Sequence, residues 1–278
     1  MRIEAGCVAC VTGAGSGIGR GIALALAARG AAVAVCDIRA EAAEAVAAEI
    51  VAAGGRALAL GLDVSDAAAV EAAAGRIEAE LGPVAILCNN AGVAMHGVPM
   101  HEIALSDWDW VIGVNIMGVV HGIRSFVPRM LARGTPAHVV NTASIGGFQV
   151  NPAFLTGAYS MTKYAVVALS EGLANELADS PIGVSVLAPA AVATGIHLSG
   201  RARPERLGGA TERAENHFMG DLIRDGAAPE VVGARVAEAI EAGEFYIFTH
   251  PETRPWLEAR HARILAGFEA TAVPRAAE

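Results

Sequence analysis

Thr12-Gly13-Ala14-Gly15-Ser16-Gly17-Ile18-Gly19 is the stretch that decides the fold of this chain. It follows a short apolar run at residues 7–12 and precedes a segment with helical periodicity at residues 17–29. Glycines in such a turn let the backbone approach a pyrophosphate, and the N-terminus of the following helix offers free N–H donors. A plain strand-to-helix turn is the alternative. In this context the pattern predicts cofactor contacts from Gly13, Ser16, Gly17, Ile18 and Gly19.

The alternation of apolar runs and helical segments continues along the chain. Strands are predicted at residues 7–12, 32–36, 57–62, 84–89, 138–142, 184–188 and 245–248. Helices are predicted at residues 17–29, 40–53, 66–81, 106–132, 157–178 and 229–242. Strands that are apolar on both faces favour a parallel sheet covered by helices. Right-handed crossovers then predict an α/β fold, a Rossmann-type doubly wound sheet of about seven strands.

The composition excludes several functional classes. The 278 residues are 54% apolar and 18% charged, which allows a large core and excludes disorder as the main state. The 20 basic and 29 acidic residues give a net charge of -9, with no basic stripe for nucleic acid. No apolar run reaches the ~20 residues of a membrane span, and no signal peptide precedes the glycine-rich turn. We therefore expect a cytoplasmic protein without nucleic-acid or membrane partners.

The chain is expected to form a single domain over residues 1–278. Residues 194–228 combine Gly, Arg and Glu with little periodicity, which favours a substrate lid inserted into that domain. Residues 251–270 predict a C-terminal helical extension, and the tail after Ala270 is expected to fray. Cys7 and Cys10 form a C-x-x-C pair in the first strand, where this offset places the thiols on opposite faces. We interpret them as reduced core thiols, and the sequence predicts no metal site.

An acidic residue ends the second predicted strand. Asp37 follows Gly19 at about the spacing, roughly 20 residues, of an acid that hydrogen-bonds the adenosine ribose. Its charge would repel a 2′-phosphate, so Asp37 and the adjacent Ile38 predict NAD rather than NADP as the cofactor. Arg39 keeps NADP open as the alternative, because its side chain can turn toward such a phosphate.

Polar residues also follow the third and fourth predicted strands. They stand at the carboxyl ends of parallel strands, where doubly wound sheets bind their ligands. Asp and Asn are also common at such positions as turn or cap residues. On the functional interpretation, further cofactor contacts come from Asp63, Val64, Asn90, Ala91 and Gly92.

Tyr159 and Lys163 lie four positions apart on a predicted helix, so one ligand can reach both side chains. Lys163 is the only lysine in the chain. A phenol titrates near ~10, and a neighbouring ammonium would favour the phenolate and lower that pKa. An ordinary surface pair is the alternative. Ser144 ends the fifth strand and can donate to a carbonyl oxygen, while Asn115 interrupts an apolar helix, where a buried amide needs partners.

In this order, the motifs resemble those of the short-chain dehydrogenase/reductase family across nearly the whole chain. The resemblance implies hydride transfer between NAD(P) and an alcohol or carbonyl, with Tyr159 as the general acid/base. It implies that Lys163 lowers the pKa of the phenol and holds the nicotinamide ribose. Ser144 would orient the substrate oxygen, and Asn115 would hold a water of the proton relay. The chain departs from the family at Ala190, where many members have glycine. Further implied cofactor contacts are Pro189, Val192 and Thr194.

The predicted substrate pocket is mostly apolar and has no Arg or Lys placed to clamp a phosphate or carboxylate. Its candidate residues are Met95, His96, Ser144, Phe148, Phe154, Leu155, Ile196 and His197. They predict an apolar or aromatic secondary alcohol, or its ketone, as the small-molecule substrate. The C-terminal part is similar to that of aryl-ether Cα-dehydrogenases, which implies benzylic alcohols, although aliphatic, terpene and steroid alcohols stay open. A non-catalytic NAD-binding regulator and an NADP-dependent ketoreductase are the alternatives, and the family implies a homodimer or homotetramer.

Overall fold

The strands of the computed structural model, which describes residues 1–212 and 217–269, form one parallel sheet. The strand order is β3-β2-β1-β4-β5-β6-β7. The bounds are β1 Val8–Thr12, β2 Ala32–Asp37, β3 Ala57–Gly61, β4 Ile86–Asn89, β5 Ala137–Thr142, β6 Ile182–Ala188 and β7 Tyr246–Phe248. Each predicted strand is present with its ends shifted by one or two residues, and the predicted fold class is confirmed. Because the order reverses between β1 and β4, their carboxyl ends open a crevice.

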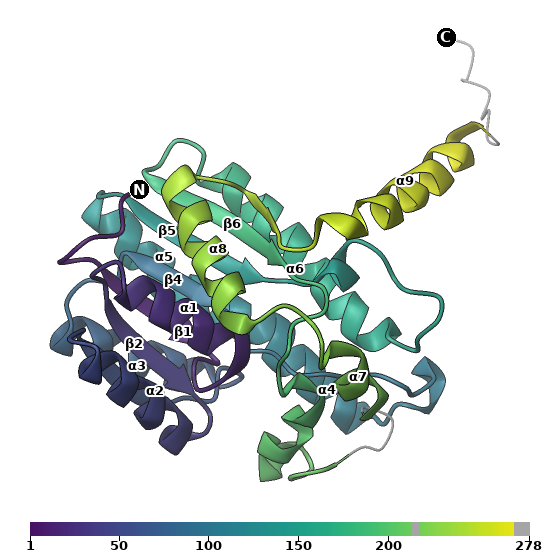
Figure 1. Cartoon of the computed structure of the whole chain (residues 1–278), viewed down its shortest axis with the longest axis horizontal. Coiled ribbons are helices and arrows are strands. Elements are labelled where there is room, and N and C mark those ends of the chain that lie inside the picture. Colours follow the sequence, from purple (N-terminus) through teal and green to yellow (C-terminus); the bar gives the residue numbers. More distant parts are fainter. Residues whose placement is uncertain (213–216, 270–278) are drawn as a thin grey trace.

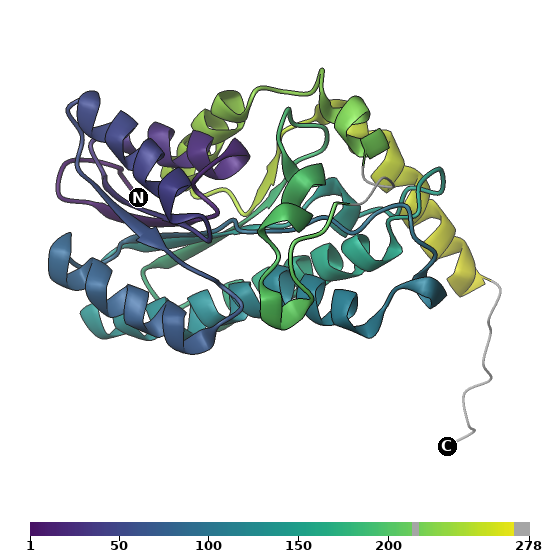
Figure 2. The same cartoon turned by 90° about the horizontal axis from the view of Figure 1, so that it is seen from below.

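Helices cover both faces of this sheet (Figures 1 and 2). The helices are α1 Gly17–Ala27, α2 Ala40–Ala52, α3 Ala67–Glu80, α4 Leu105–Ile112, α5 Gly118–Arg133, α6 Gly157–Glu176, α7 His217–Ile223, α8 Pro229–Ala242 and α9 Arg254–Glu269. Helices α1, α2 and α8 bury their apolar sides on one face, and α3, α4, α5 and α6 on the other. Along β1, the side chains of Ala9 and Val11 belong to the core under α1, α2 and α8, and those of Val8 and Cys10 belong to the core on the opposite face of the sheet. Burial on both faces explains the uninterrupted apolar strands.

The predicted helix at residues 106–132 is divided in the structure. A π-helical turn at Gly113–Met117 separates α4 from α5, and the N–H of Gly118 bonds to Gly113 O, five residues back. By length and composition, the stretch Leu105–Arg133 could cross a membrane, unlike the sequence-based expectation. Half of its most apolar window is buried inside the molecule, as in a core helix.

The predicted lid, residues 194–228, consists of 3₁₀ helices at Ile196–Ala202 and Glu205–Leu207, followed by α7. Arg203 attaches it to α4: its Nη1 donates to Asp107 Oδ1 at 2.5 Å, and its guanidinium lies 5.3 Å from the centre of the Trp110 ring. Both side chains of this ion pair are buried. Breaking a buried ion pair is strongly destabilising, so this contact anchors the lid to α4.

The chain after β7 forms the predicted C-terminal extension. A 3₁₀ turn at Pro251–Thr253 leads into α9, which projects from the body of the molecule in Figure 1. Near its base, the Arg260 guanidinium lies 5.1 Å from the centre of the Tyr164 ring. The expected fraying after Ala270 concerns residues outside the described part of the chain. The exposed apolar residues of α9 are Trp256, Ile264, Leu265 and Phe268.

Candidate active site

Tyr159 and Lys163 lie in the first turns of α6, beside the carboxyl end of β5. Their i, i+4 spacing places Lys163 Nζ 5.6 Å from the centre of the Tyr159 ring. Lys163 is 3% exposed and donates to Thr142 O at 2.9 Å. Within the described part of the chain, the Lys163 ammonium makes no other hydrogen bond, so two of its three N–H donors are left for a ligand.

Burial changes the pKa values of both groups. It raises the pKa of the Tyr159 phenol to about 12, although a hydrogen bond with Ser144 acts in the opposite direction. It lowers the pKa of the Lys163 ammonium to about 8. The sequence predicted a lowered phenol pKa, but in the chain alone the loss of hydration outweighs the hydrogen bond with Ser144 and raises that pKa. The positive ring of an oxidised nicotinamide would favour the phenolate further.

Asn115 sits in the π-helical turn and is fully buried. Its Oδ1 accepts the Val93 N–H at 2.8 Å, and its Nδ2 donates to Val93 O at 3.0 Å and to Thr162 Oγ1 at 3.1 Å. The amide therefore joins the wide turn to α6 and to the loop after β4. A Cβ placed on Gly92 would lie 3.5 Å from Asn115 Oδ1 and 3.4 Å from Lys163 Nζ. Both groups thus approach the same glycine.

Ser144 follows β5 in an extended conformation and begins a short 3₁₀ turn. Its Oγ accepts the Gly146 N–H at 3.1 Å and lies 3.4 Å from Pro189 O. The hydrogen bond that lowers the pKa of Tyr159 comes from this hydroxyl. The structure therefore brings the four predicted catalytic side chains together, and the water expected at Asn115 stays a prediction.

The other end of the site is built around Asp37. Its Oδ2 accepts the Gly15 N–H at 2.9 Å and its Oδ1 the Arg39 N–H at 3.0 Å. A Cβ on Gly15 would lie 2.8 Å from Asp37 Oδ2, so the missing side chain lets the carboxylate reach the turn. The Arg39 guanidinium lies beside both groups, 3.7 Å from Asp37 Oδ1 and 3.3 Å from Ser16 Oγ.

One pocket of about 420 Å³ runs from Asp37 to Lys163. The predicted cofactor residues that line it are Gly13, Ser16, Gly17, Ile18, Gly19, Asp37, Ile38, Asp63, Val64, Asn90, Ala91, Gly92, Tyr159, Lys163, Pro189 and Thr194. Val192 is the exception, since it is 3% exposed and packs in the core. A Cβ on Gly19 would lie 2.2 Å from Gly13 O, and one on Gly13 2.8 Å from Ala91 Cα. These glycines expose backbone to the pocket, which fits the pyrophosphate of a dinucleotide.

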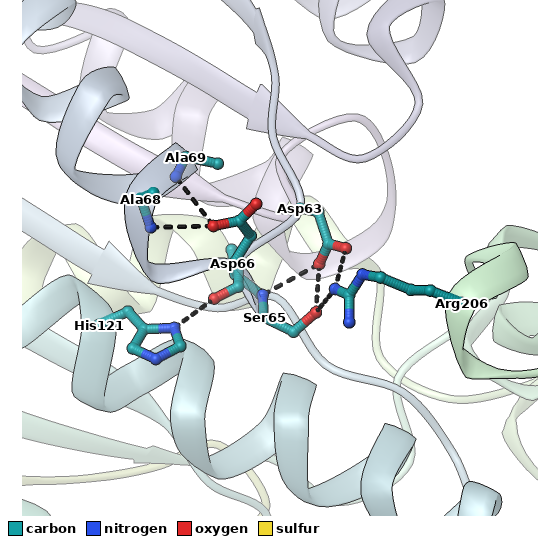
Figure 3. A network of polar contacts seen from close by, with 8 residues as sticks. Asp63, Ser65, Asp66, Ala68, Ala69, His121 and Arg206 are labelled. Atoms are coloured by element: carbon teal, nitrogen blue, oxygen red, sulfur yellow. Dashed lines mark hydrogen bonds and ion pairs between the residues drawn. The ribbon is translucent and has the colours of Figure 1, made fainter.

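Asp63 lines the pocket just after the end of β3 and is bonded to an arginine from the lid (Figure 3). Its Oδ1 accepts the N–H and hydroxyl of Ser65 at 3.0 and 2.5 Å. Arg206 Nη2 donates to Asp63 Oδ2 at 2.6 Å and to Ser65 Oγ at 2.6 Å. Burial alone would raise the pKa of Asp63, but these hydrogen bonds and the guanidinium outweigh it and lower the pKa. Arg206 thus ties the lid to the cofactor pocket.

We expect Arg206→Gln to speed the release of a bound dinucleotide from the protein, because the lid loses its ion pair with Asp63. The arginine side chain is 51% exposed, so the pair is worth no more than ~1 kcal/mol and the release rate should rise about two- to fivefold. Stopped-flow fluorescence measures this rate. The matched control is Arg76→Gln, which removes an exposed ion pair to Glu80 on α3 and should leave the rate unchanged. If the natural protein, Arg206→Gln and Arg76→Gln released the dinucleotide at equal rates, Arg206 would not hold the lid.

The predicted substrate residues are spread over several surroundings. Ile196 lines the pocket, whereas Met95 is 1% exposed and packs in the core. The Phe148 ring packs against Phe248 of β7, with ring centres 5.2 Å apart. Phe154 is partly buried and Leu155 is exposed, and both lie outside the pocket lining, as does Ser144. His197 lines an adjoining pocket of about 580 Å³, which shares Gly17, Thr194 and Gly195 with the first.

His96 packs directly on Tyr159. The centres of the His96 and Tyr159 rings are 4.8 Å apart, and His96 is 3% exposed. Its Nδ1 is buried and has no hydrogen-bond partner among the described residues. Burial lowers the pKa of His96 to about 4, so the ring is uncharged near neutral pH. An uncharged imidazole can hold the phenol ring in place by packing against it. Such a contact, unlike a hydrogen bond accepted from the phenol, does not oppose ionisation of the phenol.

The free energy of unfolding should fall as the pH drops from about 6.5 to about 4. Burial lowers the pKa of both His96 and His138 to about 4, below the value near ~6.5 of an unfolded chain, so the unfolded state binds more protons in this window. At pH 5, each of the two histidines should lower the free energy of unfolding by about 2 kcal/mol relative to pH 7. Urea denaturation at pH 7 and pH 5 measures the loss.

A matched pair of variants separates these histidines from other acid effects. His138→Gln should reduce the pH dependence, because it removes a buried imidazole that lies 2.7 Å from Ser185 Oγ. His101→Gln should leave it unchanged, because that side chain is 82% exposed. A pH dependence that is the same in both variants would contradict the assignment. Carboxylates with lowered pKa values, such as Asp63, act only at lower pH.

Sequence reasoning missed part of the pocket lining. The sequence predicted the lid as a segment but not its individual contacts. Trp110 and Val114 fall in a predicted helix, and nothing in their spacing indicates that they line a pocket. Ser199 Oγ accepts the Ala94 N–H at 3.0 Å, a contact across more than a hundred residues that no local pattern encodes. The missed residues that line the pocket include Trp110, Val114, Leu198, Ser199, Arg201, Ala202 and Pro204.

Known proteins share this arrangement. Residues 7–204 match the family described as short chain dehydrogenase. The chain is 38% identical to the C alpha-dehydrogenase of Sphingobium sp. (strain NBRC 103272 / SYK-6), over 93% of this chain and 85% of that protein. It is 35% identical to the 1-deoxy-11-beta-hydroxypentalenate dehydrogenase of Streptomyces exfoliatus, over 88% and 84% of the two chains.

A solved structure gives the same result for the fold. The short chain dehydrogenase/reductase from Burkholderia phymatum, crystallised in complex with NAD, is 35% identical and is covered over 100% of both chains with a TM-score of 0.91. A doubly wound sheet with this pocket at its switch point defines a nucleotide-binding protein of the Rossmann type. Within that class, the chain belongs to the short-chain dehydrogenase/reductase family.

Proposed function

We propose that this protein is an NAD-dependent dehydrogenase that oxidises an apolar or aromatic secondary alcohol to its ketone. The observation that carries the proposal is the pair of Tyr159 and Lys163, which line the pocket that begins at Asp37, with Ser144 hydrogen-bonded to Tyr159 behind the lining. The apolar lid residues Ile196, Leu198 and Ala202 in the pocket lining support the substrate class. Arg201 also lines the pocket, unlike the sequence-based expectation, and its guanidinium is bonded to Glu212. The relatives named as dehydrogenases support the direction of the reaction.

The side chains of the site have separate tasks in this proposal. NAD, when bound, supplies the acceptor for the hydride of the alcohol carbon. The Tyr159 oxygen takes the hydroxyl proton, and Ser144 donates a hydrogen bond to the substrate oxygen. Lys163, held by Thr142 O, stabilises the phenolate and uses its remaining donors on the nicotinamide ribose. Asn115 keeps the π-helical turn against α6, on which the tyrosine and lysine stand.

The choice of nucleotide rests on Asp37. Its carboxylate is held by two backbone N–H groups at the pocket edge, where it can accept the ribose hydroxyls and would repel a 2′-phosphate. A second candidate, an NADP-dependent ketoreductase, is favoured by Arg39, whose guanidinium lies beside Ser16 at the same edge.

The test is NADH formation by the purified protein with a panel of hydrophobic secondary alcohols, benzylic ones included. NAD and NADP are compared side by side, and the corresponding ketones are offered with NADH and NADPH. Turnover with NAD supports the proposal, and turnover with NADP alone supports the ketoreductase. Tight NAD binding without turnover of any alcohol or ketone would favour a non-catalytic regulator instead.

We also propose a homodimer or homotetramer that works in the cytoplasm. Exposed apolar side chains on α5 and α6, Leu131 and Met161, support a partner surface. Four free cysteines suit a reducing compartment. Light scattering at micromolar concentration tests the assembly, and a monomer mass would contradict it.

A further inference from the structure

The loop after β6 is held from the C-terminal side by His250. The Ala190 N–H donates to His250 Nδ1 at 3.3 Å, and His250 Nε2 lies 2.9 Å from Ala191 O. The Thr249 hydroxyl also lies 2.7 Å from Nδ1. A backbone N–H can only donate, so Nδ1 must carry the lone pair and Nε2 the proton. One neutral imidazole therefore binds two successive peptide groups of the loop.

Ala190 stands where many members of the family have glycine. Among the described residues, no residue other than glycine has a positive φ, so Ala190 adopts an ordinary backbone conformation. The loop thus needs no left-handed residue at this point, which resolves the departure seen in the sequence. Its course is fixed by hydrogen bonds from outside the loop.

The loop lies between this histidine and the catalytic centre. On one side, Pro189 O accepts the Ile145 N–H at 2.9 Å and lies 3.4 Å from Ser144 Oγ. On the other side, Ala191 O also accepts the Ala227 N–H at 2.9 Å, at the end of the lid. A shift of the loop would therefore move both a wall of the pocket and the support of Ser144.

We propose that His250 is a positioning residue that fixes the loop of residues 189–194 for the nicotinamide end of the cofactor. The inference rests on the proposed function, which places Lys163 beside the nicotinamide ribose; Pro189 and Thr194 line the same pocket as Lys163. His250 itself does not line the pocket, so it acts through the loop. It lies outside residues 7–204, the part of the chain that matches the family.

The two hydrogen bonds of the imidazole differ in importance. Ala191 O keeps a second donor, Ala227 N–H, if the histidine is replaced. The Ala190 N–H has His250 Nδ1 as its acceptor, and without it this peptide group can turn away. The acceptor at Nδ1 is therefore the part of the side chain that positions the loop.

Two variants of similar polarity separate these bonds. In His250→Asn, the side-chain oxygen can replace Nδ1 as acceptor, whereas in His250→Gln the side-chain amide can replace Nε2 as donor. Calorimetry then measures the affinity for NAD and for ADP-ribose, which lacks the nicotinamide. We expect His250→Gln to bind NAD about tenfold more weakly, because the loop is correctly placed for a smaller fraction of the time. Its affinity for ADP-ribose should stay within about twofold, and His250→Asn should bind NAD within about threefold of the natural protein.

The controls distinguish positioning from a loss of stability. His261→Gln, on the exposed side of α9, should change neither affinity. Equal weakening of NAD and ADP-ribose in His250→Gln, or no weakening of either, would overturn the positioning role while leaving the proposed function intact. If the natural protein binds neither ligand, the proposed function fails and this inference fails with it.

Discussion

Replacing Tyr159 with phenylalanine is expected to lower kcat for alcohol oxidation about 10³-fold, because the phenol oxygen is the group that takes the hydroxyl proton. The substitution removes one oxygen from a side chain packed between His96 and Lys163 and leaves the ring contacts in place. NAD affinity should therefore stay within about threefold of the natural protein, the loss of one hydrogen bond. Initial rates of NADH formation and NAD titration measure the two quantities separately.

Tyr164→Phe is the matched control for this variant. Tyr164 lies one turn further along α6, on the side that faces Arg260 of α9, and its hydroxyl is remote from the pocket lining. Its replacement should leave kcat unchanged. If Tyr159→Phe kept more than about a tenth of the turnover, the proton would have to leave by another group and the mechanism would be wrong.

The pH profile gives a second test of the same group. Burial raises the pKa of Tyr159 to about 12, and only the ionised phenol can accept a proton. Turnover of the alcohol should therefore rise with pH as the phenolate fraction grows. The rise should disappear in the residual activity of Tyr159→Phe. The buried Lys163, whose pKa is lowered to about 8, would lose its charge at high pH and limit that rise.

The sheet and most of the cofactor pocket could be predicted from sequence because both depend on local signals. Each strand is buried on both faces and appears as an uninterrupted apolar run. The carboxyl ends of parallel strands meet at one edge, so Asp37, Asp63 and Asn90 had to converge once the fold was known. Val192 departs from this because its side chain turns into the core rather than the pocket.

The remaining features depend on contacts between distant segments. The helical periodicity of residues 106–132 continues through the π-helical turn, so the pattern hides the break that Asn115 occupies. Arg203 and Arg206 fall in the segment predicted as a lid, but the sequence does not show that one is buried against Asp107 and the other reaches Asp63. No pattern in the sequence indicates that His250 accepts a hydrogen bond from the loop after β6. No spacing along the chain encodes these three contacts.

Helices α1 and α8 are in close backbone contact at Gly233. Gly233→Ala is expected to lower the free energy of unfolding by about 3 kcal/mol or more, because the added methyl group overpacks this contact. A Cβ on Gly233 would lie 2.1 Å from Gly21 O and 2.2 Å from Gly21 C, and these backbone atoms cannot rotate away. The helices would have to separate, and α1 carries the turn that receives the pyrophosphate. NAD affinity should therefore fall together with stability.

Gly75→Ala is the matched control, because it makes the same substitution inside a helix. Gly75 is an exposed residue of α3, and a Cβ there would meet no atom within 4 Å. Alanine should stabilise that helix by ~0.5–1 kcal/mol through its higher helix propensity. Urea denaturation of the two variants should thus give changes of opposite sign. If Gly233→Ala also gained stability, the helices could not be in backbone contact, and the approach of α8 to the cofactor-binding turn would be wrong.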